Sequence, residues 1–187
     1  MLHHVAKAFA AVWNGLSKPG GATEVAMDLA DWVRAFRGLH EKARRGALGS
    51  VEAESYKAGR ESLARALVSA QGLTRQPDQS PREALRVARV LQVDLESRVR
   101  LERLSTSEIS LGGFSARMAR APAPDEELTA TVRLPGLDPL KAPVKVVGTK
   151  AQPGSVLVSF SFGKLDAASA ERLELSIFDV VLAQMAK

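Results

Sequence analysis

Two short segments of the chain combine side chains that can bind an anion. Arg82 and Arg86 bracket the sequence Arg-Glu-Ala-Leu-Arg, and Glu108 opens the sequence Glu-Ile-Ser-Leu-Gly-Gly between two strand-like runs. Arginine presents a planar fork of donors that fits phosphate oxygens and purine edges. A Gly-Gly turn lets the backbone approach a ligand closely. Together the segments predict a site for a phosphorylated ligand at the junction of a helical half and a β half.

The first 75 residues have the periodicity of amphipathic helices, with apolar side chains recurring every three or four positions. One helix is predicted over Leu2–Leu16, and a Pro-Gly-Gly break follows it. A second helix begins after a Thr23 cap, and a third follows Gly49. Neither of these two can bury its apolar stripe alone, so we expect them to form an antiparallel hairpin.

Beyond a polar, proline-bounded linker the periodicity changes from about 3.6 to about 2 residues, which is typical of strands. Asp166 is expected to cap a terminal helix. The pattern predicts a small antiparallel barrel or sandwich. The predicted organisation is a helical module over residues 1–75, a linker over 76–86 and a β domain over 87–187. The expected strands cover residues 87–96, 99–109, 113–118, 128–134, 144–149 and 156–162.

Composition excludes several classes of function. The chain of 187 residues has no cysteine, which excludes disulfides, thiol catalysis and zinc-thiolate sites. The net charge of +5 is spread over both halves, so no nucleic-acid-binding patch is predicted. No apolar run approaches the ~20 residues that span a bilayer, and we expect a cytoplasmic protein. All three histidines lie in the helical half and no catalytic motif is present, so an enzyme is not expected.

From about residue 79 onward the chain resembles the PilZ domain family of bacterial cyclic di-GMP receptors. Arg82 to Arg86 matches the family's Arg-x-x-x-Arg segment, and Glu108 to Gly113 matches its (Asp/Asn)-x-Ser-x-x-Gly segment except at the first position. The strand order and the final helix are similar to the family's barrel. The resemblance therefore implies an α+β chain, with an N-terminal helical hairpin, a six-stranded antiparallel β-barrel and a C-terminal helix. The hairpin at residues 23–72 looks like an added module.

The resemblance also implies a ligand, cyclic di-GMP, which many family members bind as a stacked dimer. Arg82 and Arg86 would contact its phosphates and guanine edges, whereas their spacing alone favours exposed linker charges or pairs with Glu83 and Asp78. Ser110 would hydrogen-bond the ligand or simply the turn backbone. Gly112 and Gly113 would complete the site, with Gly113 either leaving room for a base or adopting a positive φ angle. No metal is implied.

Glu108 departs from the family pattern and leaves two functions open. Its longer side chain could reach the base from another angle, miss it, or pair with one of the arginines. The first hypothesis is a second-messenger receptor that transmits cyclic di-GMP binding to a protein partner by rearranging the linker and the helical module. The alternative is a PilZ-fold protein-interaction module with weak or no nucleotide binding, in which Trp32 and Phe36 contact the partner. A homodimer is another way to bury the apolar stripes.

Overall fold

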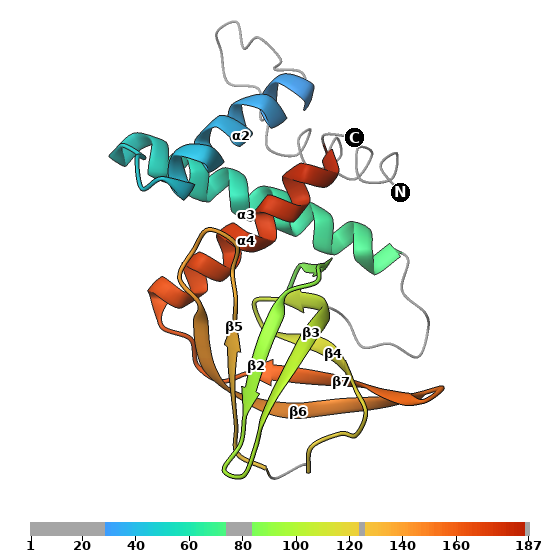
Figure 1. The fold of residues 1–187 in the computed structure, drawn as a ribbon. Helices are drawn as coiled ribbons and strands as arrows, with labels where there is room; N and C mark the ends of the chain where they lie inside the picture. The colour runs from blue at the N-terminus through green and yellow to red at the C-terminus, as the bar shows by residue number, and fades with distance from the viewer. Residues whose placement is uncertain (1–28, 74–83, 124–125, 186–187) are drawn as a thin grey trace, which may run out of the picture. The chain divides into compact units, whose positions relative to one another are not determined.

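The computed structural model of the chain describes residues 29–73, 84–123 and 126–185. The chain divides into two compact units, residues 1–85 and 86–187, and each is described by itself (Figure 1). The helix predicted over Leu2–Leu16, the Thr23 cap and Arg82 lie outside the described residues.

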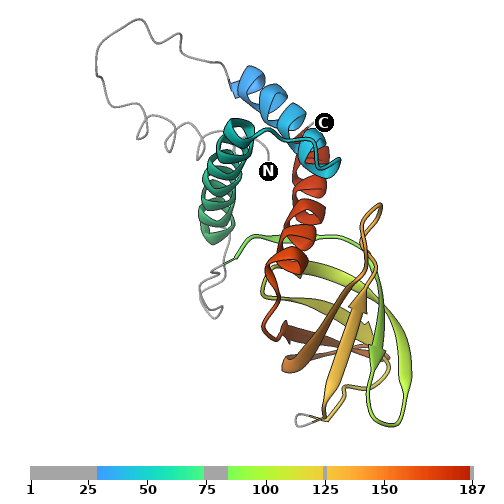
Figure 2. The same cartoon turned by 90° about the vertical axis from the view of Figure 1, so that its left-hand side faces the viewer.

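The helical unit contains α2 (Leu29–Arg44) and α3 (Ser50–Leu73), and a short turn joins them (Figure 2). The predicted hairpin is confirmed, because side chains in the middle of α2 meet side chains near the start of α3. Phe36 and Tyr56 are buried, and their ring centroids lie 5.4 Å apart. Trp32 stacks on Phe36 at 5.1 Å. Gly59 makes room for this stack, since a Cβ there would lie 3.0 Å from the Phe36 ring.

The β unit contains seven antiparallel strands, and six of them form a closed ring (Figure 1). The strand order is β1-β3-β2-β5-β6-β7-β4, and an additional pairing of β3 with β4 closes the ring. The predicted six-stranded barrel is therefore confirmed, with the short β1 paired to β3 outside the ring. The strands are β1 (Arg86–Ala88), β2 (Gln92–Glu96), β3 (Leu101–Ser110), β4 (Gly113–Met118), β5 (Leu128–Val132), β6 (Leu140–Gln152) and β7 (Ser155–Phe162).

A side chain from β3 separates β1 from β2, which the sequence predicts as one strand. The Thr106 hydroxyl accepts a hydrogen bond from Leu91 N at 2.9 Å and donates one to Arg89 O. It thereby satisfies backbone groups that lose their partners where the ladder is interrupted. The Arg89 guanidinium in turn donates to Ser176 O at 2.7 Å. This bond ties the end of β1 to the C-terminal helix.

The terminal helix α4 (Ala167–Met185) begins where the sequence predicts and contacts β1 and β6. Asp166 caps it: its carboxylate accepts hydrogen bonds from Ser169 N at 2.7 Å and Ser169 Oγ at 2.9 Å. These bonds hold the pKa of Asp166 below its ordinary value. Apolar side chains of α4 are buried, Leu173 and Phe178 almost completely. Among the described helices, none is both long and apolar enough to cross a membrane.

Candidate ligand-binding site

The segment from Glu108 to Gly113 forms the hairpin between β3 and β4. Ser110 lies directly opposite Gly113 in the ladder, so Leu111 and Gly112 make a two-residue turn. The buried Ser110 hydroxyl donates to Gly113 O at 3.2 Å. Gly112 O accepts hydrogen bonds from Phe162 N at 3.0 Å and from Ser161 Oγ at 3.3 Å. The hairpin is thus held by the Ser110 hydroxyl within the turn and by two donors from β7.

Gly113 is required by a close approach of two strands. A Cβ at this position would lie 1.9 Å from Phe160 O, a separation that no side chain tolerates. The sequence predicts that Gly113 leaves room for a base or adopts a positive φ angle. The backbone contact with β7 is a further reason, which becomes visible only once β4 and β7 are paired.

Arg86 begins β1 and lies opposite Ser110 in the ladder with β3. Its Nη1 atom is 3.4 Å from Glu108 Oε2, and the two side chains are 40% and 42% exposed. One of the three alternatives for Glu108, a pair with an arginine, is therefore present. Exposed pairs of this kind contribute about 0.2–1 kcal/mol, so the contact is weak enough for a ligand to displace. Arg82 lies outside the described residues, and its role remains an expectation.

Small residues of β4, β6 and β7 continue the surface on which Arg86 and Ser110 lie. Gly113 faces Ser161, and Ser115 faces Ser159, which in turn faces Gly148. Residues directly opposite in an antiparallel ladder point to the same side. The serines and glycines therefore form a floor of small residues on the outer face of the barrel beside the hairpin. Gly148 is exposed and Ser159 and Ser161 are half-buried, whereas Ser110, Gly113 and Ser115 are buried. The sequence reasoning missed Ser115, Ser159 and Ser161, although the alternation of serine with apolar residues along 158–162 predicts that Ser159 and Ser161 face outward.

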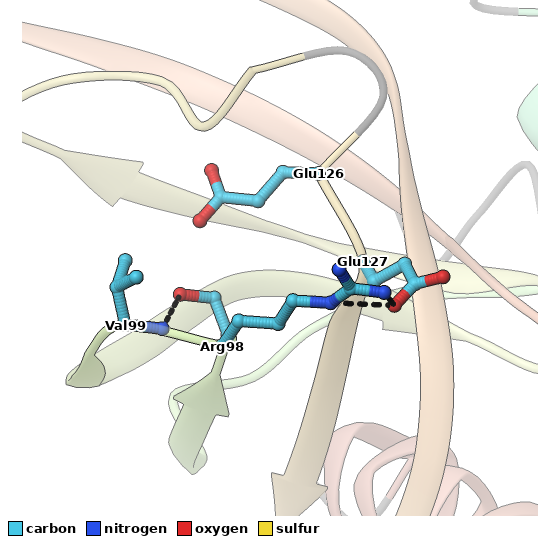
Figure 3. Close-up of a pocket in the computed structure, with 5 residues that line it drawn as sticks. Arg98, Val99, Glu126 and Glu127 are labelled. Atoms are coloured by element: carbon cyan, nitrogen blue, oxygen red, sulfur yellow. Dashed lines mark hydrogen bonds and ion pairs between the residues drawn. The ribbon is translucent and has the colours of Figure 1, made fainter.

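A hollow lies at the other end of β3, between the turn after β2 and the residues before β5 (Figure 3). Its lining includes Arg98, Val99, Glu126 and Glu127. The Arg98 side chain extends towards Glu127, and Nη2 lies 2.7 Å from the carboxylate (Figure 3). The ten residues of β3 place the hollow about 30 Å from the hairpin. Because two carboxylates and a single arginine line it, this hollow is poorly suited to an anion.

Several solved structures are similar to part of this chain. They include the inhibitor of motility MotI/DgrA of Bacillus subtilis, with 19% identity, a TM-score of 0.49, and coverage of 58% of this chain and 53% of that chain. The PilZ domain of YcgR from Escherichia coli with c-di-GMP has 13% identity, a TM-score of 0.46, and coverage of 57% and 96%. The MrkH–c-di-GMP complex of K. pneumonia has 16% identity, a TM-score of 0.49, and coverage of 58% and 57%.

The similarity thus spans about half the length of the MotI/DgrA and MrkH chains. No curated protein matches the sequence. The sequence model of the PilZ domain, by contrast, matches residues 79–179, more than half of the chain. That stretch contains the arginine segment, the β3–β4 hairpin and all strands of the closed ring. The chain therefore belongs to the PilZ domain family.

Proposed function

We propose that this protein is a cyclic di-GMP receptor without catalytic activity, acting in the bacterial cytoplasm. The observation that carries the proposal is the meeting of Arg86 with the β3–β4 hairpin, inside the residues that match the family. A guanidinium at this point can bind a phosphate or the O6 and N7 atoms of guanine. Ser110, Gly112 and Gly113 would border the same ligand. Glu108 would either contact the guanine edge or lose its ion pair with Arg86 when Arg86 binds the ligand.

Arg82 is proposed to add a second guanidinium from the linker over residues 76–86. Each charge-assisted hydrogen bond contributes about 1.5–3 kcal/mol. A few such bonds, less the cost of ordering the linker, are enough for a micromolar complex of about −8 kcal/mol. A stacked dimer of cyclic di-GMP would present more guanine edges and phosphates to the same two arginines than a single molecule does.

We propose that ligand binding is transmitted to a protein partner by a rearrangement. In it, the linker and the helical module over residues 1–75 change their position relative to the β domain over residues 87–187. A ligand can shift the balance between two arrangements only by its difference in affinity for them. Ordering of the linker around the ligand would supply that difference. The partner, whether another protein or a second copy of this chain, would then contact a rearranged helical surface.

The alternative function is a PilZ-fold interaction module with weak or no nucleotide binding. The Arg86–Glu108 pair favours it, because the carboxylate occupies a donor that the ligand needs. Phe36 is 3% exposed, so it belongs to the core of the hairpin rather than to a docking surface. Trp32 is only half-buried and is the better candidate for a partner contact.

Titration calorimetry of the full chain with cyclic di-GMP tests the proposal. Wild type should bind, and Arg86→Ala should abolish measurable binding, because it removes the guanidinium that begins β1. Arg103→Ala is the matched control, since Arg103 lies on β3 with an 85% exposed side chain and faces Asp94 instead of the hairpin. Absence of wild-type binding at about 100 μM ligand, a free energy weaker than about −5.5 kcal/mol, would refute the receptor function and leave the interaction module.

A further inference from the structure

The charges of the barrel are segregated by strand. β4, β6 and β7 contain no aspartate or glutamate, whereas β2 and β3 contain several. Lys141, at the start of β6, lies 3.8 Å from Glu96 of β2. Arg117 of β4 and Lys145 and Lys150 of β6 are exposed, and among the described residues none of the three has an ion-pair partner. β4, β6 and β7 therefore carry only cationic charges, and the carboxylate of Glu108 on β3 borders them beside Arg86.

The strand register places Lys145 in line with the candidate site. Arg86 faces Ser110, Ser110 faces Gly113, Gly113 faces Ser161, and Ser161 faces Lys145. The five residues form one row across β1, β3, β4, β7 and β6. Neighbouring strands lie about 4.8 Å apart, so the four steps separate the two cationic ends by at most about 19 Å along the surface.

A second row with two cations runs across the same face. Arg117 faces Leu157, and Leu157 faces Lys150. Between the two rows lies a third, in which Glu108 faces Ser115, Ser115 faces Ser159 and Ser159 faces Gly148. Beyond Glu108, the side chains of this row are short or absent. The floor of small residues is thus bordered by the Arg86–Glu108 pair at one end, by Lys145 at the other, and by the second row along its side.

We propose that this floor is an extended anion site and that Lys145 binds a phosphate of the ligand that Arg86 does not reach. The inference rests on the proposed function. A cyclic dinucleotide carries two phosphates, and two stacked molecules carry four. A site with cations at one end only would leave the far phosphates without a counter-charge. Lys145 supplies a flexible ammonium with three donors at the opposite end of the row, and Arg117 and Lys150 add to the attractive field.

Titration calorimetry with cyclic di-GMP on the full chain tests the role of Lys145. Lys145→Ala should raise Kd about tenfold, because one charge-assisted hydrogen bond is lost. Lys145→Glu should raise it further, and Lys145→Arg should retain affinity close to wild type. Lys141→Ala is the matched control and should change Kd less than about twofold, since Lys141 lies on the same strand but faces Thr131 of β5.

The outcomes separate this inference from the proposed function. If wild type binds and Lys145→Ala binds within twofold of it, the Lys145 subsite is refuted and the receptor function stands. If Lys141→Ala weakens binding as much as Lys145→Ala does, net charge is responsible and the subsite is again refuted. If wild type does not bind, both fail together. Chemical unfolding of each variant should show an unchanged transition, so that loss of binding is not loss of fold.

Discussion

Replacing Glu108 with aspartate should strengthen cyclic di-GMP binding. In the structure the Glu108 carboxylate lies 3.4 Å from Arg86 Nη1. Aspartate is shorter by one methylene group, so it draws the carboxylate away from the guanidinium. Aspartate also restores the residue that the family pattern has at this position. The substitution therefore frees a donor for the ligand and returns an acceptor for its guanine edge.

The two effects differ in size. Release of Arg86 contributes at most about 1 kcal/mol, because the pair is two-fifths exposed and screened by solvent. A carboxylate that accepts hydrogen bonds from guanine contributes about 1.5–3 kcal/mol. Together they should lower Kd at least tenfold. Glu108→Gln keeps the length of the side chain and removes its charge, so it should produce only the first effect, at most about fivefold.

Calorimetric titration of wild type, Glu108→Asp and Glu108→Gln measures these differences directly. Equal affinity in all three proteins would refute the reasoning, because it would mean that Glu108 neither restrains Arg86 nor lies at the guanine edge. If the glutamine variant gains as much affinity as the aspartate variant, release of Arg86 accounts for the whole gain and Glu108 does not contact the guanine edge. Urea unfolding of the three proteins should give similar midpoints, since the pair is a surface contact.

Two further predictions concern the frame that holds the site. Gly113→Ala should lower the free energy of unfolding by about 1–3 kcal/mol, because the new methyl group collides with Phe160 O. Urea unfolding measures this free energy. Gly112→Ala is the control and should change the free energy of unfolding little, because its Cβ would meet nothing closer than 3.9 Å. Equal effects of the two substitutions would contradict the argument. Asp166→Ala should lower Tm at pH 7 by removing the cap on Ser169. Because these bonds hold the pKa of Asp166 below its ordinary value, the difference in Tm between wild type and variant should have its full size above about pH 4 and should disappear as the pH falls further. A difference in Tm that does not depend on pH would argue against this reasoning.

The sequence predicts β4 and β7 closely because local pattern and tertiary pairing agree there. Residues 113–118 are bounded by a Gly-Gly turn, and apolar residues alternate with serine over residues 158–162. β6 is much longer than the predicted 144–149, since it begins before Pro143 and continues to Gln152. Proline suggests a strand boundary. Here Pro143 is paired with Thr129 of β5, a partner that sequence periodicity does not reveal.

The break between β1 and β2 depends on Thr106, which is distant in sequence from the residues it separates. Periodicity within residues 87–96 therefore reads as one strand. The hairpin residues of the site were predictable from their own motif. Their alignment with Ser161 and Lys145 was not, because it follows from the pairing of β4 with β7 and of β7 with β6. A bulge between Val146 and Gly148 shifts that register, and the sequence alone does not locate it.

The far half of β6 has a consequence for how variants of this protein are handled in solution. Beyond Val144, and among the described residues, β6 is paired only with β7, so one backbone edge carries donors and acceptors without a strand beside it. Lysine side chains and a bulge are devices that discourage such an edge from adding a strand of another molecule, and this edge has Lys145, Lys150 and a bulge. The two lysines therefore protect the barrel from sheet-to-sheet aggregation as well as forming part of its cationic face. Sample dispersity is the first property to inspect when either one is neutralised.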